Sequence, residues 1–313
     1  MPQTRQDALE ILVVGAGELG SRVIRALAAR AEREGARISV LLRPDTASSP
    51  SPVRRALLEE LAALKVAVIH ADIAASDAHG LARIFRAFHT VVNCTGFVGG
   101  PGTQCKLTAA ALEAGVARYV PWQFGIDYDT IEAGSAGGLF DEQIAVRAML
   151  RSQQATRWLI VSTGMFTSFL FEPAFGVVDL EGLRVNALGS WDTRVTVTTP
   201  EDIGRLTADI LFTQPVDHSG IFFTAGETLS YGRLADLVEQ RFQRRVERIE
   251  WSVPMLEDEL AKQPQDTMRK YRLAFAREPG VAWDVGLTYN AQRGLATEDV
   301  AHFLRGHRGV AAM

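Results

Sequence analysis

The sequence predicts a doubly wound α/β fold, in which helices cover both faces of a parallel sheet. Two observations lead to this prediction. Short apolar runs typical of buried strands alternate with amphipathic helical patterns as far as residue 162. The first run, residues 11–14, ends in a glycine-rich turn that leads directly into a helical pattern. Crossover connections of this length are right-handed and place successive strands in one parallel sheet.

The glycine-rich turn has the pattern G-x-G-x-x-G at Gly15, Gly17 and Gly20. Gly15 allows a sharp turn, Gly17 lets a pyrophosphate approach the backbone, and Gly20 lets the helix pack against the strand. The start of the helix directs unpaired N–H groups and a partial positive charge at the phosphates. Strand, turn and helix occur in the required order, so we predict a dinucleotide-binding Rossmann core. Glu18 and Leu19 complete the expected phosphate-binding turn.

The second strand, residues 37–43, ends in Arg43, where NAD-binding folds usually carry an acidic residue for the ribose hydroxyls. An arginine instead suits the 2′-phosphate of NADP(H), to which it can donate charge-assisted hydrogen bonds. The sequence therefore predicts NADP(H) as the cofactor. Two alternatives stay open, because Asp45 lies close enough to face the ribose and Arg43 can equally be a solvated charge at a strand end.

Further candidate cofactor residues follow from the expected strand order. The carboxyl ends of parallel strands meet at one edge of the sheet, and such folds bind their ligands there. Each further candidate ends one of the third to sixth expected strands or follows it closely. These residues are Asp72, Thr95, Gly96, Phe97, Gln123, Phe124 and Gly164.

The regular alternation stops after Thr163, which predicts a smaller C-terminal α+β domain. We expect an NADP-binding Rossmann domain over residues 1–164 and about 195–226. The substrate-binding domain is then expected over residues 165–194 and 227–313.

Residues 164–176 are rich in phenylalanine, with the spacing of neither a helix face nor an alternating strand. The segment is either the core of the second domain or an apolar wall for an aromatic substrate. The candidate substrate residues are Phe97, Trp122, Met165, Phe166 and Phe169.

Composition restricts the function further. The chain has 313 residues, 47% of them hydrophobic, and a formal net charge of −4, which argues against a nucleic-acid-binding surface. Arg54 and Arg55 form a short pair expected on a solvated helix face. The two cysteines have no metal-type spacing, so we expect no metal site and a reducing, cytoplasmic location. No apolar stretch reaches 18 residues, so we expect no membrane span. A monomer or homodimer is expected.

The usual catalytic pair of short-chain dehydrogenases is missing. That pair is a tyrosine followed four residues later by a lysine that lowers the tyrosine pKa, and none of the five tyrosines has it. No lysine occurs between residues 121 and 166, where the nicotinamide is expected. Hydride transfer itself needs no protein nucleophile, because the cofactor carries that chemistry. A proton donor is still expected.

Residues 114–127, A-G-V-A-R-Y-V-P-W-Q-F-G-I-D, resemble the signature strand and Phe-Gly-x-Asp turn of one branch of the short-chain dehydrogenase superfamily. This is the NmrA-like and isoflavone-reductase-like branch. Other stretches fit the same branch, so the resemblance spans most of the chain: the glycine-rich turn, Arg43, Asp72, Gln104 at a helix start, and residues 201–204. The resemblance implies an NADPH-dependent reductase of an aromatic, phenylpropanoid- or isoflavonoid-like small molecule.

The chain departs from that branch at two positions. Reductases of the branch carry a lysine four residues before an arginine on the helix after the Phe-Gly-x-Asp turn. The matching arginine here is Arg147, and Gln143 replaces the lysine. A glutamine can hydrogen-bond a substrate oxygen but cannot act as a general acid at neutral pH. Gly164 replaces an asparagine that such proteins often carry after the sixth strand.

Three explanations of Gln143 stay open, and the residue itself either orients the substrate or is structural. The protein reduces its substrate with another proton donor, such as Tyr128, Asp127, Asp141, Glu142 or a water. Alternatively, it reduces a substrate that needs no acid from the protein. In the third case it is a non-catalytic NADP(H) sensor that acts through a protein partner, as NmrA-type regulators do. The aromatic segment favours the reductase, and the missing lysine favours the sensor.

Overall fold

The computed structural model describes residues 8–44, 51–96, 99–277 and 279–306. By its internal contacts the chain divides into two compact units. Unit 1 comprises Met1–Gln123, Ala145–Ile160 and Ile203–Ile221, and unit 2 comprises Phe124–Ile144, Val161–Asp202 and Phe222–Met313. Unit 2 thus begins earlier than the expected boundary at residue 164. The reason is packing, because Ile126, Tyr128 and Phe140 belong to the hydrophobic core of unit 2.

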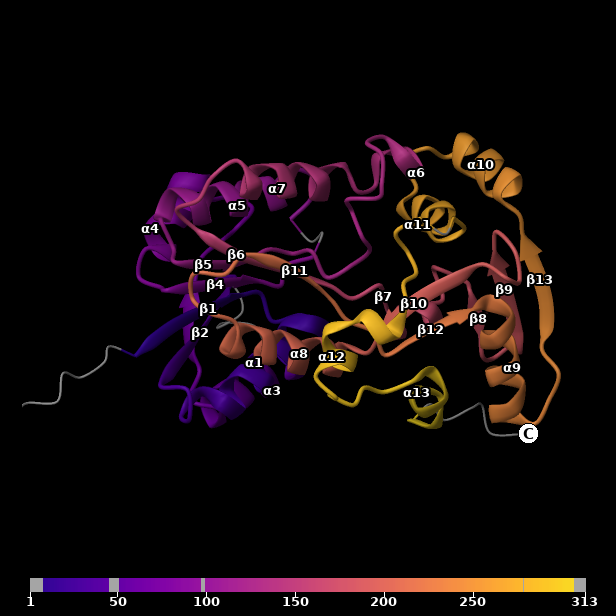
Figure 1. The fold of residues 1–313 in the computed structure, drawn as a ribbon, viewed down its shortest axis with the longest axis horizontal. Helices are drawn as coiled ribbons and strands as arrows, with labels where there is room; N and C mark the ends of the chain where they lie inside the picture. Colours follow the sequence, from indigo (N-terminus) through magenta and orange to yellow (C-terminus); the bar gives the residue numbers. More distant parts are fainter. Residues whose placement is uncertain (1–7, 45–50, 97–98, 278, 307–313) are drawn as a thin grey trace, which may run out of the picture. The chain divides into compact units, whose positions relative to one another are not determined.

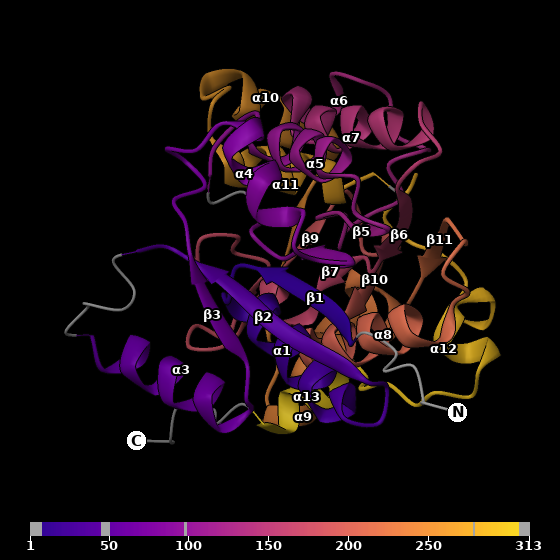
Figure 2. The ribbon, with the colours of Figure 1, turned by 90° about the vertical axis from the view of Figure 1, so that its left-hand side faces the viewer.

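Unit 1 is built on a seven-stranded sheet with the order β11-β6-β5-β4-β1-β2-β3. The strands are β1 (Leu9–Val14), β2 (Ala36–Leu42), β3 (Ala67–His70), β4 (Thr90–Asn93), β5 (Arg118–Val120), β6 (Arg157–Ser162) and β11 (Gly220–Phe223). β1 pairs in parallel with β2 and β4, and the pairs β2–β3, β4–β5 and β5–β6 are also parallel. Figure 2 shows β3, β2 and β1 side by side. The predicted doubly wound parallel fold is confirmed.

Helices cover both faces of this sheet (Figure 1). α1 (Glu18–Ala31) and α8 (Pro200–Thr213) lie on one face, and α4 (Ala78–Phe85) and α5 (Thr103–Ala114) lie on the other. The remaining helices near the sheet are α3 (Pro52–Ala63) and α7 (Asp141–Arg151). Because both faces are covered, residues 11–14 of β1 are completely buried, which explains their uninterrupted apolar run.

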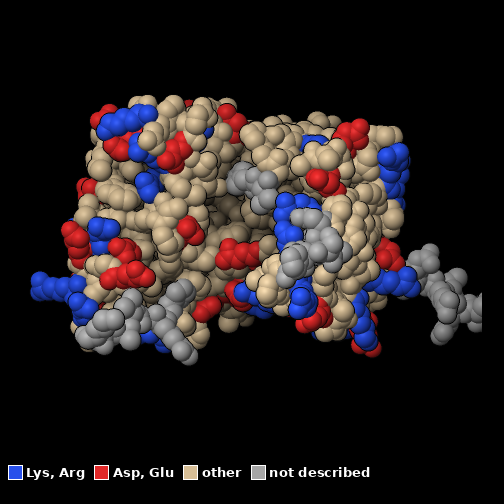
Figure 3. All heavy atoms as spheres, turned by 180° about the vertical axis from the view of Figure 1, so that it is seen from behind, with Lys and Arg blue, Asp and Glu red and all other residues tan. Residues whose placement is uncertain are grey.

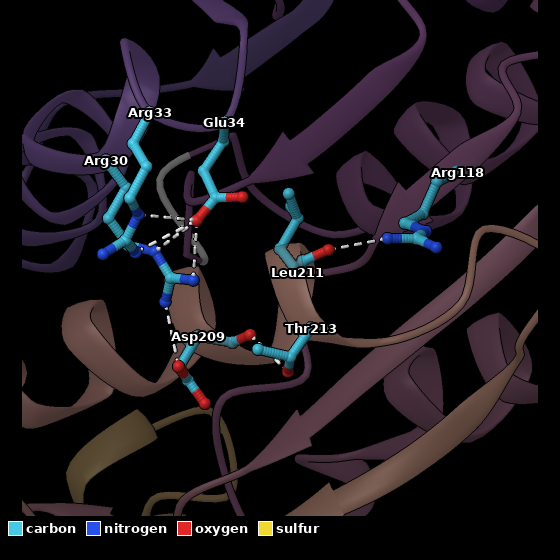
Figure 4. A network of polar contacts seen from close by, with 7 residues as sticks. All are labelled: Arg30, Arg33, Glu34, Arg118, Asp209, Leu211 and Thr213. Carbon is cyan, nitrogen blue, oxygen red and sulfur yellow. Dashed lines mark hydrogen bonds and ion pairs between the residues drawn. The ribbon is translucent and has the colours of Figure 1, made fainter.

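Polar contacts hold α8 to the rest of unit 1 (Figure 4). Arg30 on α1 pairs with Glu34 and with Asp209 of α8, each at 2.9 Å. The buried Arg118 of β5 donates to the carbonyl oxygen of Leu211 at 2.7 Å. The last carbonyl groups of a helix lack intrahelical donors, so Arg118 caps the end of α8.

Unit 2 contains two three-stranded sheets, with the orders β12-β10-β7 and β13-β9-β8. The strands are β7 (Met165–Phe166), β8 (Val178–Asp179), β9 (Arg184–Leu188), β10 (Arg194–Thr198), β12 (Glu227–Ser230) and β13 (Glu247–Trp251). The helices are α6 (Ser135–Gly138), α9 (Tyr231–Phe242), α10 (Val253–Lys262), α11 (Thr267–Phe275), α12 (Tyr289–Gln292), α13 (Val300–Gly306) and the short 3₁₀ turns η1 (Thr167–Phe171) and η2 (Val285–Leu287). The unit is therefore of mixed α and β structure, as the sequence predicts.

The phenylalanine-rich segment contributes to the core of unit 2. Phe175 is completely buried, and its ring stacks on that of Phe169 with 4.5 Å between centroids. Phe169 also meets Tyr271 of α11 edge to face at 5.2 Å. Met165 is 3% exposed and belongs to the same core, whereas Phe166 is half-buried. Core packing, one of the two interpretations of this segment, therefore accounts for the burial of Phe175 and for the ring contacts of Phe169.

The surface carries charges of both signs. Figure 3 shows Asp and Glu side chains interspersed with Lys and Arg on one face of the molecule. In the part of the chain that the structure describes, no helix is both long and apolar enough to span a bilayer.

Candidate cofactor site

A groove of about 410 Å³ opens in unit 1 where the parallel strands end. Its walls come from the end of β2, from the loops after β1, β2, β3 and β4, from α3 and from the start of α5. The predicted residues among its lining are Gly15, Gly17, Arg43, Asp72 and Thr95. Four separate strand ends therefore contribute to one groove, as expected for a parallel sheet.

The structure explains why glycine occurs at each of the three positions of the turn. Gly15 has a φ of +92°, a backbone conformation that residues with a side chain rarely adopt. A Cβ on Gly20 would lie 2.2 Å from the carbonyl oxygen of Gly15, so only glycine allows α1 to pack this closely. No described atom lies within 4 Å of a Cβ built on Gly17, which leaves its backbone open to the groove. Glu18 is exposed and Leu19 is buried, so Leu19 can offer only its backbone to a ligand.

Two arginines line the groove near the end of β2. Arg43 follows β2 directly, and Arg54 lies in the first turn of α3. From the sequence Arg54 is expected on a solvated helix face, whereas in the structure it lines the groove. Val53, which is 79% exposed, and Leu57 line the groove from the same helix and add an apolar surface. Asp45, the alternative ribose partner, lies outside the described residues.

The loop after β3 forms another wall of the groove through Asp72, Ile73 and Ala74. The carboxylate of Asp72 accepts hydrogen bonds from the N–H groups of Ala74 at 2.8 Å and Ala75 at 3.2 Å. Asp72 therefore closes a turn that presents Ile73 and Ala74 to the groove.

Buried side-chain amides fix the turn after β4. The Oδ1 atom of Asn93 accepts from the N–H group and the hydroxyl group of Thr95, at 3.1 and 2.8 Å. The Nε2 group of Gln104 donates to the carbonyl oxygen of Gly96 and, at 3.3 Å, to the Thr95 hydroxyl. The Tyr119 hydroxyl accepts from Asn93 at 3.3 Å, and burial raises the pKa of Tyr119 to about 12, so this phenol stays protonated. Asn93 was not among the predicted site residues, although a polar amide at the end of a buried strand is a sequence pattern that can indicate such a role.

Residues around the fifth strand divide between the two units. Gln123, in unit 1, is completely buried and accepts a hydrogen bond from Nε of the buried Arg147 at 3.0 Å. The indole of Trp122 packs over Gly96, where a Cβ would lie 3.5 Å from the ring. Phe97, another aromatic candidate from the sequence, lies outside the described residues.

The predicted catalytic residues belong to unit 2. Gln143 on α7 is completely buried. Tyr128 is 5% exposed, its ring lies 5.3 Å from that of Phe140, and its hydroxyl lies against Gly125. A Cβ on Gly125 would come within 2.3 Å of the hydroxyl oxygen, so this glycine admits the phenol. Phe124, just before it, is 5% exposed.

The Phe-Gly-x-Asp turn is joined to the residues that follow β6. The carbonyl oxygen of Gly125 accepts from the N–H groups of Thr163 at 2.9 Å and Gly164 at 3.0 Å. Gly164 has a φ of +69°, and a Cβ there would lie 2.1 Å from the carbonyl oxygen of Thr196. This close approach and the positive φ explain why this chain carries glycine at position 164.

The strand order and the glycine-rich turn are those of the Rossmann-type dinucleotide-binding fold. More narrowly, the chain belongs to the NmrA-like family, whose model matches residues 8–276. The family resemblance predicted from the sequence is therefore confirmed.

Three known proteins illustrate the relationship. An NmrA-like family domain-containing oxidoreductase of Gibberella moniliformis is 45% identical over 296 residues, which cover 94% of this chain and 97% of that protein. The leucoanthocyanidin reductase–NADPH complex of Vitis vinifera has a TM-score of 0.76 at 16% identity, with 95% of this chain and 98% of that chain covered. The structure of AtPrR2 with NADP+ and (+)pinoresinol has a TM-score of 0.73 at 18% identity, with 95% and 98% covered.

Proposed function

We propose that this protein is an NADPH-dependent reductase that transfers hydride to an aromatic, phenylpropanoid- or isoflavonoid-like small molecule. The main support is the groove of unit 1, in which a glycine-rich turn and two arginines line one cavity. The Gibberella relative is named an oxidoreductase, and two proteins of the same fold hold NADPH, or NADP+ with pinoresinol.

The groove fits a phosphorylated dinucleotide. The open backbone at Gly17, at the start of α1, suits a pyrophosphate. Arg43 and Arg54 would hold the 2′-phosphate, and the apolar side chains of Leu57 and Ile73 would pack against the adenine. Bound NADPH would supply the hydride, and the chain has to hold the reacting groups and deliver a proton.

Unit 2 would supply the substrate site and the acid. We propose that Gln143 orients a substrate oxygen through its amide, because glutamine cannot give up a proton at neutral pH. The proton would then come from the Tyr128 hydroxyl. The proposed substrate contacts are the aromatic and apolar candidates named from the sequence, Phe97, Trp122, Met165, Phe166 and Phe169.

The decay of NADPH absorbance with a panel of aromatic carbonyl and ene compounds tests the proposal. We expect turnover with at least one member of the panel and none when NADPH is omitted. Tight NADPH binding without turnover across a broad panel would refute the reductase and leave the second candidate.

The second candidate is a non-catalytic NADP(H) sensor that acts through a protein partner. It is favoured by one observation, the buried Gln143 at the position of the family lysine. A sensor must distinguish the two redox forms, so its affinities for NADPH and NADP+ have to differ. Equal affinities for both forms would exclude this candidate.

A further inference from the structure

Lys106 on α5 makes contacts that the proposed reaction does not require. Its ammonium group donates to the carbonyl oxygens of Ile73 at 2.6 Å and Ser76 at 3.0 Å, and it lies 3.5 Å from that of Ala74. A lysine ammonium has three N–H donors, and here three carbonyl oxygens of one short loop converge on it. Lys106 therefore clamps the loop that follows β3.

Asp72 fixes the same loop from inside. Its carboxylate accepts from the N–H groups of Ala74 and Ala75, whereas Lys106 binds carbonyl oxygens of the loop. Both kinds of backbone group in this loop are thus bound by charged side chains, whose hydrogen bonds are the stronger ones. Ile73 and Ala74, which the two side chains hold, line the groove.

The first turn of α5 acts on two walls of the groove. Gln104 binds the carbonyl oxygen of Gly96 after β4, and Lys106, two residues later, binds the loop after β3. Unlike Arg43 and Arg54, Lys106 is not among the residues that line the groove. Its effect on a ligand would therefore pass through the loop.

We propose that Lys106 is a positioning residue for the adenine end of the bound dinucleotide, because it holds Ile73 and Ala74 where they line the groove. This proposal rests on the proposed cofactor function. Loss of the ammonium group should therefore weaken the binding of ligands that reach the loop. The binding of ligands that occupy only the nicotinamide end should not change.

The test uses the full chain and two probes, 2′,5′-ADP for the adenine end and nicotinamide mononucleotide for the other end. For Lys106→Met we expect about fivefold weaker 2′,5′-ADP binding, the order of one hydrogen bond. Binding of nicotinamide mononucleotide should stay within about twofold of the wild type. Hydrogen exchange of the Ala74 and Ala75 amides should accelerate, because the loop loses its clamp.

Two further variants separate positioning from charge. Lys65→Met removes the same charge from an exposed residue of unit 1 that does not line the groove, and we expect wild-type binding of both probes. Lys106→Arg keeps a cationic N–H donor and should bind 2′,5′-ADP more tightly than Lys106→Met does. An equal loss of 2′,5′-ADP binding in Lys65→Met would assign the effect to charge and overturn the proposal.

Other outcomes are equally decisive. Unchanged 2′,5′-ADP binding in Lys106→Met, an equal loss for both probes, or failure of this variant to fold would each overturn the positioning role. A folded wild-type protein that binds no 2′,5′-ADP would instead refute the proposed cofactor function. In that case hydrogen exchange, which needs no ligand, still shows whether Lys106 clamps the loop.

Discussion

The side chains of Asn93 and Gln104 meet in the interior of unit 1, where Nδ2 of Asn93 donates to Oε1 of Gln104 at 2.8 Å. Asn93 ends β4 and Gln104 lies in the first turn of α5, so the bond ties the two ends of the loop between them. The Oδ1 atom of Asn93 also accepts a hydrogen bond from the Thr95 hydroxyl, and the Nε2 group of Gln104 donates to the carbonyl oxygen of Gly96. The pair thereby fixes a wall of the groove without contacting solvent.

Replacement of Gln104 by leucine should destabilise the protein by about 1–3 kcal/mol, because it removes the hydrogen bonds that this buried amide makes to Asn93 and to the carbonyl oxygen of Gly96. Urea unfolding of Gln104→Leu measures this change in the free energy of unfolding. The control is Gln292→Leu at an exposed position, where we expect a change within about 0.5 kcal/mol. A similarly small change in Gln104→Leu would show that the amide pair does not stabilise the fold.

Arg43→Ala should weaken NADPH binding by about 1.5–3 kcal/mol, the scale of hydrogen bonds to a charged group. NADH lacks the 2′-phosphate, so its affinity should hardly change. Isothermal titration calorimetry with both nucleotides measures the difference. Arg37→Ala serves as the control, because Arg37 is exposed on β2, pairs with Glu10, and does not line the groove. Equal affinity of the unmutated protein for NADH and NADPH would refute the preference for NADP(H).

The fold of unit 1 was predictable because its signals are local. Residues 11–14 form an apolar run that only a strand covered on both faces explains, and Gly15 marks where it ends. β8, β9 and β13 of unit 2 were not predicted. In β13, Glu247, Arg248 and Glu250 are exposed, and the strand pairs in parallel with β9 about sixty residues earlier. No pattern within such a segment reveals a partner that distant in the sequence.

The same distinction applies to the groove. Arg43 was recognised because its position after a strand carries meaning in this fold. Arg54 and Lys106 were not, because their roles depend on where α3 and α5 place them relative to the loops of other strands. A helical charge that lines a groove has the same sequence pattern as one that faces solvent.

Arg118→Met should cost about 2–4 kcal/mol, because three carbonyl oxygens lose a buried donor. The guanidinium binds those of Leu211 at 2.7 Å, Gln214 at 3.2 Å and Pro215. Burial lowers the pKa of Arg118, which means that part of the favourable energy of these bonds offsets desolvation of the charge. Thermal or urea unfolding measures the loss. Arg33→Met is the control, since its side chain is 71% exposed.

Stability should fall in mild acid in part because of His89. Burial, with a smaller contribution from the charge of Arg118, lowers the pKa of His89 below its usual value of 6.5. The unfolded chain then takes up a proton more readily than the folded one. The destabilisation therefore begins as the pH drops below about 6.5, grows until the folded-state pKa is passed, and is absent at higher pH.

Urea unfolding at about pH 7.5 and 5.5 tests this expectation. His89→Gln should lose less stability between the two pH values than the wild type does. His70→Gln, at an exposed position of β3, controls for the removal of any histidine and should behave as the wild type. An unchanged pH dependence in His89→Gln would contradict the assignment.

The proposed roles of Tyr128 and Gln143 predict different kinetic effects when each residue is replaced. Tyr128→Phe keeps the ring that packs on Phe140 and removes only the proton donor. We expect kcat to fall about a hundredfold or more, the usual contribution of a positioned general acid, with NADPH affinity unchanged. Tyr289→Phe removes a hydroxyl from a half-buried ring near Phe222 and should leave kcat as in the wild type.

Gln143→Leu should act mainly on substrate binding, because an amide that orients a substrate oxygen contributes a hydrogen bond and no proton. We expect KM to rise with a smaller change in kcat. In Gln143→Lys, burial would disfavour the charged form of the amine and bring its pKa towards neutrality, where it can serve as a general acid. Adding Gln143→Lys to Tyr128→Phe should therefore restore part of the lost kcat, provided that circular dichroism shows the double variant to be folded. Full turnover of Tyr128→Phe alone would exclude the tyrosine as the donor.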